Sequence, residues 1–185
     1  MKTRWFGAVA AVAGLMAYAV PASAFEISSS SFPADGTFPA KYVANVIGCT
    51  GQNVSPEVKW ANPPDGTKSF AVTMYDPDAP TGSGFWHWIA VNIPPDVTEL
   101  KEGQASEGGK MPAGTIQARD DDGLSHYLGP CPPKGDKPHH YTITVYAVNV
   151  PKLEGIDSMS SGALVGFSLH YMTIGKASMT YTYGR

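Results

Sequence analysis

Glycine and proline interrupt this chain so often that long regular elements have little room to form. The 185 residues include 20 glycines and 16 prolines, well above the average combined share of about 12%. Charged residues make up only 16% of the chain, which excludes a coiled coil or long-helix protein. Aromatic and β-branched residues are plentiful, which argues against intrinsic disorder. The composition therefore predicts one compact, turn-rich domain dominated by β-strands.

The first 24 residues differ from the rest and are predicted to be a secretory signal peptide. Lys2 and Arg4 form a short basic start, and an uncharged apolar run follows over residues 5–20. Residues 22–24, Ala-Ser-Ala, provide the small-residue pattern of a cleavage site. A membrane anchor is the alternative, because residues 5–25 carry no charge and are long enough to span a bilayer. We expect cleavage, a mature domain over residues 25–185, no stable membrane insertion afterwards, and a periplasmic or secreted location.

Export changes what the two cysteines mean. Cys49 and Cys131 both lie in the predicted mature domain. In an oxidising compartment a single pair of cysteines predicts a disulfide, with two buried free thiols as the alternative. Because the chain contains no Cys-x-x-Cys sequence, neither a redox motif nor a zinc ribbon is indicated.

Short segments of alternating apolar and polar residues indicate strands, and turn residues separate them. This alternation predicts strands over residues 57–60, 69–75, 86–93, 140–148 and 179–183. In the third of these strands, His87 has the same parity as Ile89 and Val91 and is predicted to face the core with them.

One helix is predicted over residues 161–174. Its expected buried face consists of Leu164, Phe167, Tyr171 and Ile174, which recur at three- and four-residue spacing. A serine, Ser160 or Ser161, would cap the start of the helix. The predicted fold class is therefore all-β dominated, an antiparallel Greek-key-like β-sandwich with a C-terminal helix.

Three segments contain side chains suited to ligand chemistry. Residues 76–80, Asp-Pro-Asp-Ala-Pro, are predicted to hold two carboxylates at fixed positions on a proline-stiffened turn. The alternative is a turn that only ends a strand. In residues 85–88, Phe-Trp-His-Trp, one interpretation is that His87 lies at the floor of a pocket. The alternative is a buried histidine whose hydrogen bond has only a structural role. Residues 127–141 form a proline-rich loop that delivers two histidines and a tyrosine, which are donors suited to phosphate or carboxylate. The alternative for that loop is a rigid surface segment with exposed histidines.

These segments occur in the order and spacing of one known family. The chain resembles the phosphatidylethanolamine-binding proteins, also called the Raf kinase inhibitor-like family, and its bacterial YbhB/YbcL-type branch in particular. The resemblance rests on Asp76-Pro77-Asp78-Ala79-Pro80, Trp86-His87-Trp88, Tyr127-Leu128-Gly129-Pro130, Pro132-Pro133-Lys134-Gly135 and His139-His140-Tyr141. It covers nearly all of the predicted mature chain.

The resemblance implies a β-sandwich with a small anion-binding pocket near one end. Carried over to this chain, the pocket residues are Asp76, Asp78, Pro80, His87, Tyr127, Pro133, His139 and Tyr141. Two positions depart from the family pattern. His140 replaces a common arginine, and residues 121–123, Asp-Asp-Gly, replace Asp-Phe-Gly. We expect Asp76 to orient His87 or His139 by accepting a hydrogen bond from its ring.

The leading functional hypothesis is an exported, non-catalytic binding protein for small anionic or phosphorylated ligands, such as a phospholipid headgroup, without a cofactor. A protein-interaction regulator or protease-inhibitor-like protein is the alternative. An enzyme is less favoured, because no Gly-x-Ser-x-Gly, Ser-x-x-Lys or His-Glu-x-x-His motif occurs. A metal site from Asp76, His87, His139 and His140 is the remaining alternative. The net charge of −3 provides no basis for nucleic-acid binding.

Overall fold

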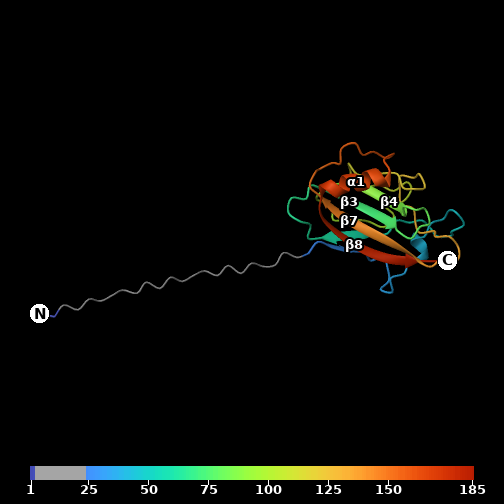
Figure 1. Ribbon diagram of the computed structural model, residues 1–185, viewed down its shortest axis with the longest axis horizontal. Helices are drawn as coiled ribbons and strands as arrows, with labels where there is room; N and C mark the ends of the chain where they lie inside the picture. The colour runs from blue at the N-terminus through green and yellow to red at the C-terminus, as the bar shows by residue number, and fades with distance from the viewer. Residues whose placement is uncertain (3–23) are drawn as a thin grey trace.

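The computed structural model describes residues 1–2 and 24–185, and this part consists of two antiparallel sheets and one α-helix (Figure 1). The predicted signal segment lies almost wholly outside the described residues. In chain order the elements are β1 (Glu26–Ser28), the 3-10 helix η1 (Ala40–Tyr42), β2 (Val58–Ala61), β3 (Ser69–Asp76), β4 (Phe85–Ile93), β5 (Glu99–Leu100), β6 (Ile116–Gln117), β7 (His139–Val148), α1 (Gly162–Met172) and β8 (Thr173–Tyr183).

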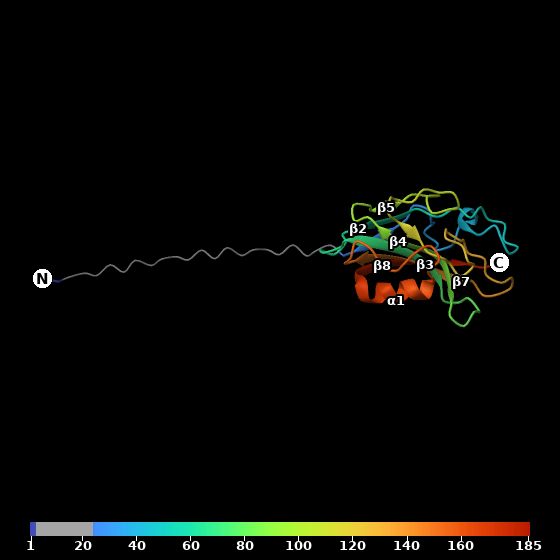
Figure 2. The same ribbon diagram turned by 90° about the horizontal axis from the view of Figure 1, so that it is seen from above.

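The larger sheet lies in the middle of the structure. Its five strands have the order β6-β4-β3-β7-β8, and the smaller sheet has the order β1-β2-β5. Figure 2 shows β2 and β5 on one side of the larger sheet and α1 on the other. Trp60 of the smaller sheet packs against Phe70 of the larger one, with ring centroids 5.2 Å apart. This apolar layer between the sheets forms the main core.

The prediction of a mostly β, antiparallel fold with one helix is confirmed. Strands β3, β4 and β7 match their predicted ranges to within one residue at each end. The two shorter predicted strands coincide with β2 and with the second half of β8. The Greek-key connectivity stays a prediction.

His87 is buried as predicted, but it does not share a side of the strand with Ile89 and Val91, and a β-bulge is the reason. Consecutive residues of β3 pair with Trp88 and Trp86, so His87 is an extra residue between the two pairs. An extra residue reverses the alternation of side chains along a strand. Ile89 therefore packs in the cluster beneath α1, whereas the His87 ring lies 5.2 Å from that of Tyr141 in the main core.

The predicted helix is present, but it buries a different face. α1 ends at Met172, and Ile174 belongs to β8. Val165 and Leu169 are the large buried side chains, whereas Leu164, Phe167 and Tyr171 are exposed. The predicted cap is confirmed, because the side chain of Ser161 accepts a hydrogen bond from the Leu164 amide. Among the described residues, no helix is long and apolar enough to cross a membrane.

Glycine determines which face of α1 meets the sheet. Gly162 lies so close to the Trp86 indole that a Cβ atom would overlap it, and Gly166 lies beside the same ring with more space. A helix side without Cβ atoms lets the backbone approach an aromatic ring closely. The spacing of apolar residues, which predicted that the face with Leu164, Phe167 and Tyr171 is buried, contains no information about the contact between the glycines and Trp86.

The two glycines provide a matched test of this packing. Gly162→Ala should lower the free energy of unfolding by about 1–3 kcal/mol, because the added methyl group overpacks the contact with Trp86. Gly166→Ala should raise it by up to about 1 kcal/mol, because a Cβ there meets the ring at 3.7 Å and alanine favours a helix. Urea unfolding of both variants measures the two effects. Equal changes in the two variants would contradict this account.

Candidate ligand-binding pocket

A buried hydrogen bond between a histidine and a carboxylate joins the end of β3 to the start of β7. Nδ1 of His139 lies 2.8 Å from Oδ2 of Asp76, and both side chains are buried. The other carboxylate oxygen of Asp76 accepts a hydrogen bond from the Asp78 amide at 2.8 Å. On the outer side of the ring, Nε2 of His139 lies 3.5 Å from the half-exposed carboxylate of Asp136. Both oxygens of Asp76 are therefore used to orient this end of the sheet.

His87 is the neutral histidine of the site. Burial lowers its pKa to about 4, against 6.5 in solvent. Its Nδ1 lies 3.2 Å from the carbonyl oxygen of Leu128. Because a carbonyl only accepts, Nδ1 carries the proton and Nε2 keeps a lone pair. Of the two histidines expected to pair with Asp76, His139 makes that hydrogen bond and His87 makes one to the 127–141 loop.

Tyr141 supplies a buried hydroxyl group to the same region. Burial, together with the charge of Asp76, raises the pKa of Tyr141 well above its usual value of 10, so the hydroxyl keeps its proton. Asp76 interacts with this hydroxyl, but no hydrogen bond of regular geometry is made to it among the described residues. A buried donor without a regular hydrogen bond costs free energy, and a ligand oxygen placed beside it would lower that cost.

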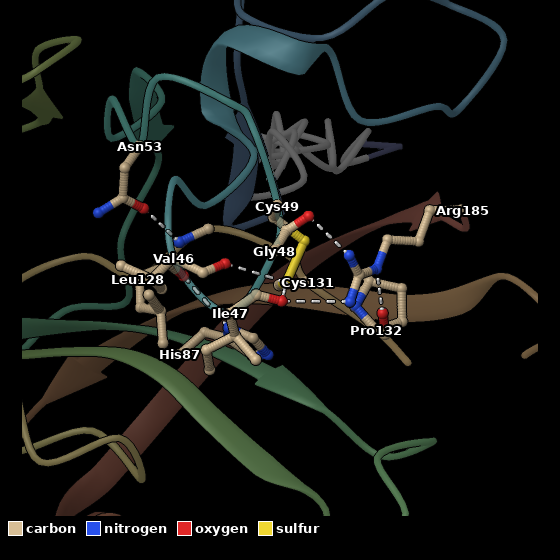
Figure 3. The surroundings of a disulfide bond; sticks show 11 residues. Val46, Ile47, Gly48, Cys49, Asn53, His87, Leu128, Cys131, Pro132 and Arg185 are labelled. Carbon is tan, nitrogen blue, oxygen red and sulfur yellow. Dashed lines mark hydrogen bonds between the residues drawn. A yellow bond between two sulfur atoms is a disulfide. The ribbon is translucent and has the colours of Figure 1, made fainter. Parts of the chain in front are cut away.

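A disulfide attaches a second loop to the pocket wall. Cys49 and Cys131 are bonded, which confirms the predicted pairing. Figure 3 shows that the bond joins the segment with Val46 and Ile47 to the 127–141 loop. The guanidinium of Arg185 donates to the carbonyl oxygens of both segments: to Pro132 from Nε at 2.7 Å, and to Gly48 from Nη1 at 2.9 Å.

Behind the disulfide, three backbone segments cross at close range. Gly51 and Gly129 both lie against the backbone of residues 42–44, and a Cβ atom on either glycine would overlap it. The amide of residue 44 donates to the Pro130 carbonyl, and the hydroxyl of Tyr127 donates to the Tyr42 carbonyl at 2.7 Å. The crossing is therefore fixed by hydrogen bonds and by the absence of side chains.

These elements enclose a cavity of about 130 Å³. That volume is small beside the roughly 300–1,000 Å³ of pockets for drug-sized ligands, so the cavity suits a small chemical group. Its floor is polar and its mouth is apolar. The lining residues include the buried polar Asp76, His87, His139 and Tyr141 at the floor, the more exposed Val46, Ile47, Pro80, Phe85 and Pro133 at the mouth, and the buried apolar Leu128 and Pro132, and no lysine or arginine is among them.

Six of the eight predicted pocket residues line this cavity. Asp78 does not: its carboxylate lies 2.7 Å from Nδ1 of His140 at the surface. Tyr127 does not either, because it is fully buried and holds the backbone crossing instead. His140, one of the two departures from the family pattern, therefore pairs outside the pocket. Among the described residues, no group of three metal-binding side chains is arranged to hold a metal ion.

Sequence reasoning missed the second wall of the cavity. Val46 and Ile47 line its mouth, and both are exposed apolar side chains. The signal that could have found them is the disulfide, because a bond from Cys49 to Cys131 brings residues just before Cys49 to the proline-rich loop. The other departure from the family pattern is Asp122, an exposed residue of a turn, and its amide donates a hydrogen bond to the Asp120 carboxylate at 3.0 Å.

Comparison with known proteins agrees with this architecture. The family model described as phosphatidylethanolamine-binding protein matches residues 28–184. The chain therefore belongs to the phosphatidylethanolamine-binding protein family.

Two relatives from Escherichia coli K12 illustrate the similarity. The chain is 46% identical to the UPF0098 protein YbcL over 176 residues, which cover 95% of this chain and 96% of YbcL. It is also 46% identical to YbhB over 142 residues, or 77% of this chain and 89% of YbhB. The crystal structure of YbcL, described as a member of the mammalian PEBP family, superposes with a TM-score of 0.84 over 88% of this chain and 99% of YbcL. The homologue CT736 from Chlamydia trachomatis, 26% identical, has a TM-score of 0.72 over 88% of this chain and 98% of CT736.

Acid should destabilise the protein through His87. Because the pKa of His87 is lowered to about 4 by folding, its contribution to stability is complete above pH 6.5 and is lost as the pH falls toward 4. The total loss is about 3 kcal/mol. His87→Gln lacks this titration, so the stability difference between the wild type and the variant should shrink between pH 7 and pH 4 in urea unfolding.

The pH experiment contains an internal control. Burial raises the pKa of Asp120 to about 6. This shift changes the free energy of unfolding in the opposite direction, because protonation of Asp120 stabilises the folded state as the pH falls below 6. Asp120 is present in both proteins, so its contribution cancels in the difference. Curves that stay parallel from pH 7 to pH 4 would show that His87 is not the group responsible.

Removing the disulfide should lower stability without unfolding the sheets. The double variant Cys49→Ser, Cys131→Ser should lose about 2–5 kcal/mol of unfolding free energy, because the bond closes a loop between residues 82 positions apart. Reduction of the wild type with dithiothreitol should produce the same loss in urea unfolding. An unchanged midpoint in both cases would contradict the stabilising role of the bond.

Proposed function

We propose that this chain is an exported, non-catalytic binding protein whose pocket takes a small anionic or phosphorylated group of the phospholipid-headgroup kind. The observation that carries the proposal is the buried Tyr141 hydroxyl, which interacts with Asp76 but makes no hydrogen bond of regular geometry among the described residues, so it is available to donate to a ligand. It lies in a small cavity together with Asp76, His87 and His139. The chemistry of these four groups defines what the cavity would accept.

The lining contains no lysine or arginine, so a fully ionised phosphate would meet no permanent positive charge. The donor available to a ligand is the Tyr141 hydroxyl, because Nδ1 of His139 is held by Asp76 and Nε2 lies 3.5 Å from the Asp136 carboxylate. Neutral His87 offers an acceptor, which suits a phosphate oxygen that still carries a proton. The pocket therefore favours a singly charged phosphate group over a doubly charged one.

The apolar mouth extends this preference to larger ligands. Val46 and Ile47 from one loop and Pro132 and Pro133 from the other surround the polar floor. A phosphate monoester or diester with a short carbon chain would place its charge at the floor and its carbons at the mouth. An ammonium group on such a chain would meet the exposed carboxylates nearby, such as Asp136.

Export is supported by two independent features. The small-residue pattern of residues 22–24 follows an apolar run, as in a cleavable signal. The disulfide Cys49–Cys131 is of the kind that persists in oxidising compartments. Both features support a location outside the cytosol, where the pocket would meet periplasmic or extracellular phosphorylated compounds.

Isothermal titration calorimetry with inorganic phosphate and with phosphoethanolamine tests the proposal. Affinity should fall as the pH rises from 5.5 to 8, because the phosphate group loses its second proton and the cavity lining offers it no permanent positive charge. Asp76→Asn should weaken binding about tenfold, or about 1.4 kcal/mol, by removing the carboxylate that holds the His139 ring. Tyr141→Phe should weaken it several-fold with little loss of stability.

Asp78→Asn is the matched control. It also removes one negative charge, only two residues from Asp76, but the Asp78 carboxylate pairs with His140 outside the cavity. Its affinity should equal that of the wild type. Two results would overturn the proposal: no binding of either compound at millimolar concentration, or an equal loss of affinity in the Asp76 and Asp78 variants.

A further inference from the structure

A second hollow, which we call the outer groove, lies directly beside the ligand pocket. It has a volume of about 360 Å³, against about 130 Å³ for the pocket. Val46 and Leu128 line both, so these two side chains form the ridge that separates them. Leu128 is 3% exposed and Val46 is 37% exposed, so Val46 forms the top of this ridge. Figure 3 shows both residues between Asn53, which lines the outer groove, and His87, which lines the pocket.

The loop that forms one wall of the outer groove is held firmly against the 127–141 loop. The Oδ1 atom of Asn53 accepts a hydrogen bond from the Gly129 amide at 2.8 Å, and its Nδ2 donates to the Tyr127 carbonyl oxygen at 3.3 Å. The amide of Asn53 donates to the Val43 carbonyl oxygen at 2.8 Å. The disulfide joins the same two loops. A wall that is fixed in this way loses little conformational freedom when a ligand binds.

Several polar side chains in the outer groove have hydrogen-bonding capacity left for a ligand. Asn45, Gln52 and Glu107 make no side-chain hydrogen bond among the described residues. The Ser106 hydroxyl accepts a hydrogen bond from a backbone amide at 2.8 Å and can still donate its own proton. Nδ1 of His126 lies 3.1 Å from a backbone carbonyl oxygen, so its Nε2 is left for a ligand. The outer groove therefore offers both donors and acceptors.

The charge of the outer groove differs from that of a phosphate site. Glu107 is its only carboxylate, and no lysine or arginine lines it in the part of the chain that the structure describes. A second anionic group would therefore be repelled here. Val54 and Leu124 add apolar surface between the polar groups. Uncharged hydroxyl groups on a carbon skeleton match this lining, because each hydroxyl can donate and accept and the carbons contact apolar side chains.

We propose that the pocket and the outer groove together bind one ligand, a phosphate ester whose alcohol part is a polyol such as a sugar or glycerol. This inference rests on the proposed function, because it places the phosphate group in the pocket. The alcohol part crosses the ridge at Val46, and its hydroxyl groups bond to Asn45, Gln52 and Glu107 in the outer groove. The ridge thus divides the ligand into a charged part and an uncharged part.

Isothermal titration calorimetry at pH 5.5 with glucose 1-phosphate and with propyl phosphate tests this inference. Both compounds are phosphate monoesters that carry mainly one negative charge at this pH, because the second pKa of such a group is about 6. Only glucose 1-phosphate has a polyol, so the wild type should bind it at least tenfold more tightly. Glucose itself should bind at least tenfold more weakly than glucose 1-phosphate, because it lacks the group that the pocket would hold.

Variants separate the two parts of the site. Gln52→Ala and Glu107→Ala should each reduce the preference for glucose 1-phosphate several-fold without weakening the binding of propyl phosphate. Tyr141→Phe should weaken the binding of both compounds by the same factor, because it acts on the phosphate group that they share. Glu154→Ala is the matched control, because Glu154 is an exposed glutamate that lines neither cavity, and it should behave like the wild type. Circular dichroism verifies that each variant is folded.

The possible failures of this inference and of the proposed function give different results. Equal affinity of the wild type for the two esters, or a preference that survives both groove variants, would overturn the polyol site and leave the phosphate pocket intact. Binding of neither ester would overturn both. Co-sedimentation with vesicles then identifies the source of the ligand. Retention on phosphatidylglycerol but not on phosphatidylethanolamine, lost in Gln52→Ala, would assign the polyol to a lipid headgroup, and retention on neither would assign it to a free ester. Equal retention on both would contradict a polyol site.

Discussion

The crossing of three backbone segments behind the Cys49–Cys131 bond is the constraint on which the pocket depends. Gly51 and Gly129 hold the backbone of residues 42–44 between them at a distance that no side chain would permit. Hydrogen bonds from Tyr127 and to Pro130 fix the direction of the crossing. Without this close approach the disulfide could not form where it does. The mouth of the cavity would then lose the wall that Val46 and Ile47 provide.

The floor of the pocket depends on a different kind of contact. Asp76 and His139 come from neighbouring strands of the central sheet, and their side chains meet in a buried environment. His87 reaches the same place only because a bulge reverses the alternation of β4. Regular pairing would have turned this ring toward α1. The irregularity in the sheet is therefore what brings the two histidines together, and bulges commonly occur beside functional sites for this reason.

The sequence predicted the strands well because alternation and turn residues act locally. It predicted most of the pocket floor because the motifs of residues 76–80 and 127–141 recur in a known family. It failed where the outcome depended on contacts between distant segments. The bulge at His87 leaves no trace in the alternation pattern. The buried face of α1 is set by two glycines against Trp86, whereas apolar spacing selected the opposite face. Tyr127 matched a family motif, yet its hydroxyl serves the backbone crossing.

The backbone crossing and the mouth of the cavity differ in how well they tolerate substitution. The crossing tolerates almost no substitution, since added side chains at Gly51 or Gly129 would overlap the backbone. Val46 and Ile47 belong to the same loop, but they line the cavity and are not members of the hydrophobic core clusters. Substitutions at these two positions would therefore change the lining of the cavity while the crossing stays intact. Ligand preference and stability would then depend on separate residues of one short loop.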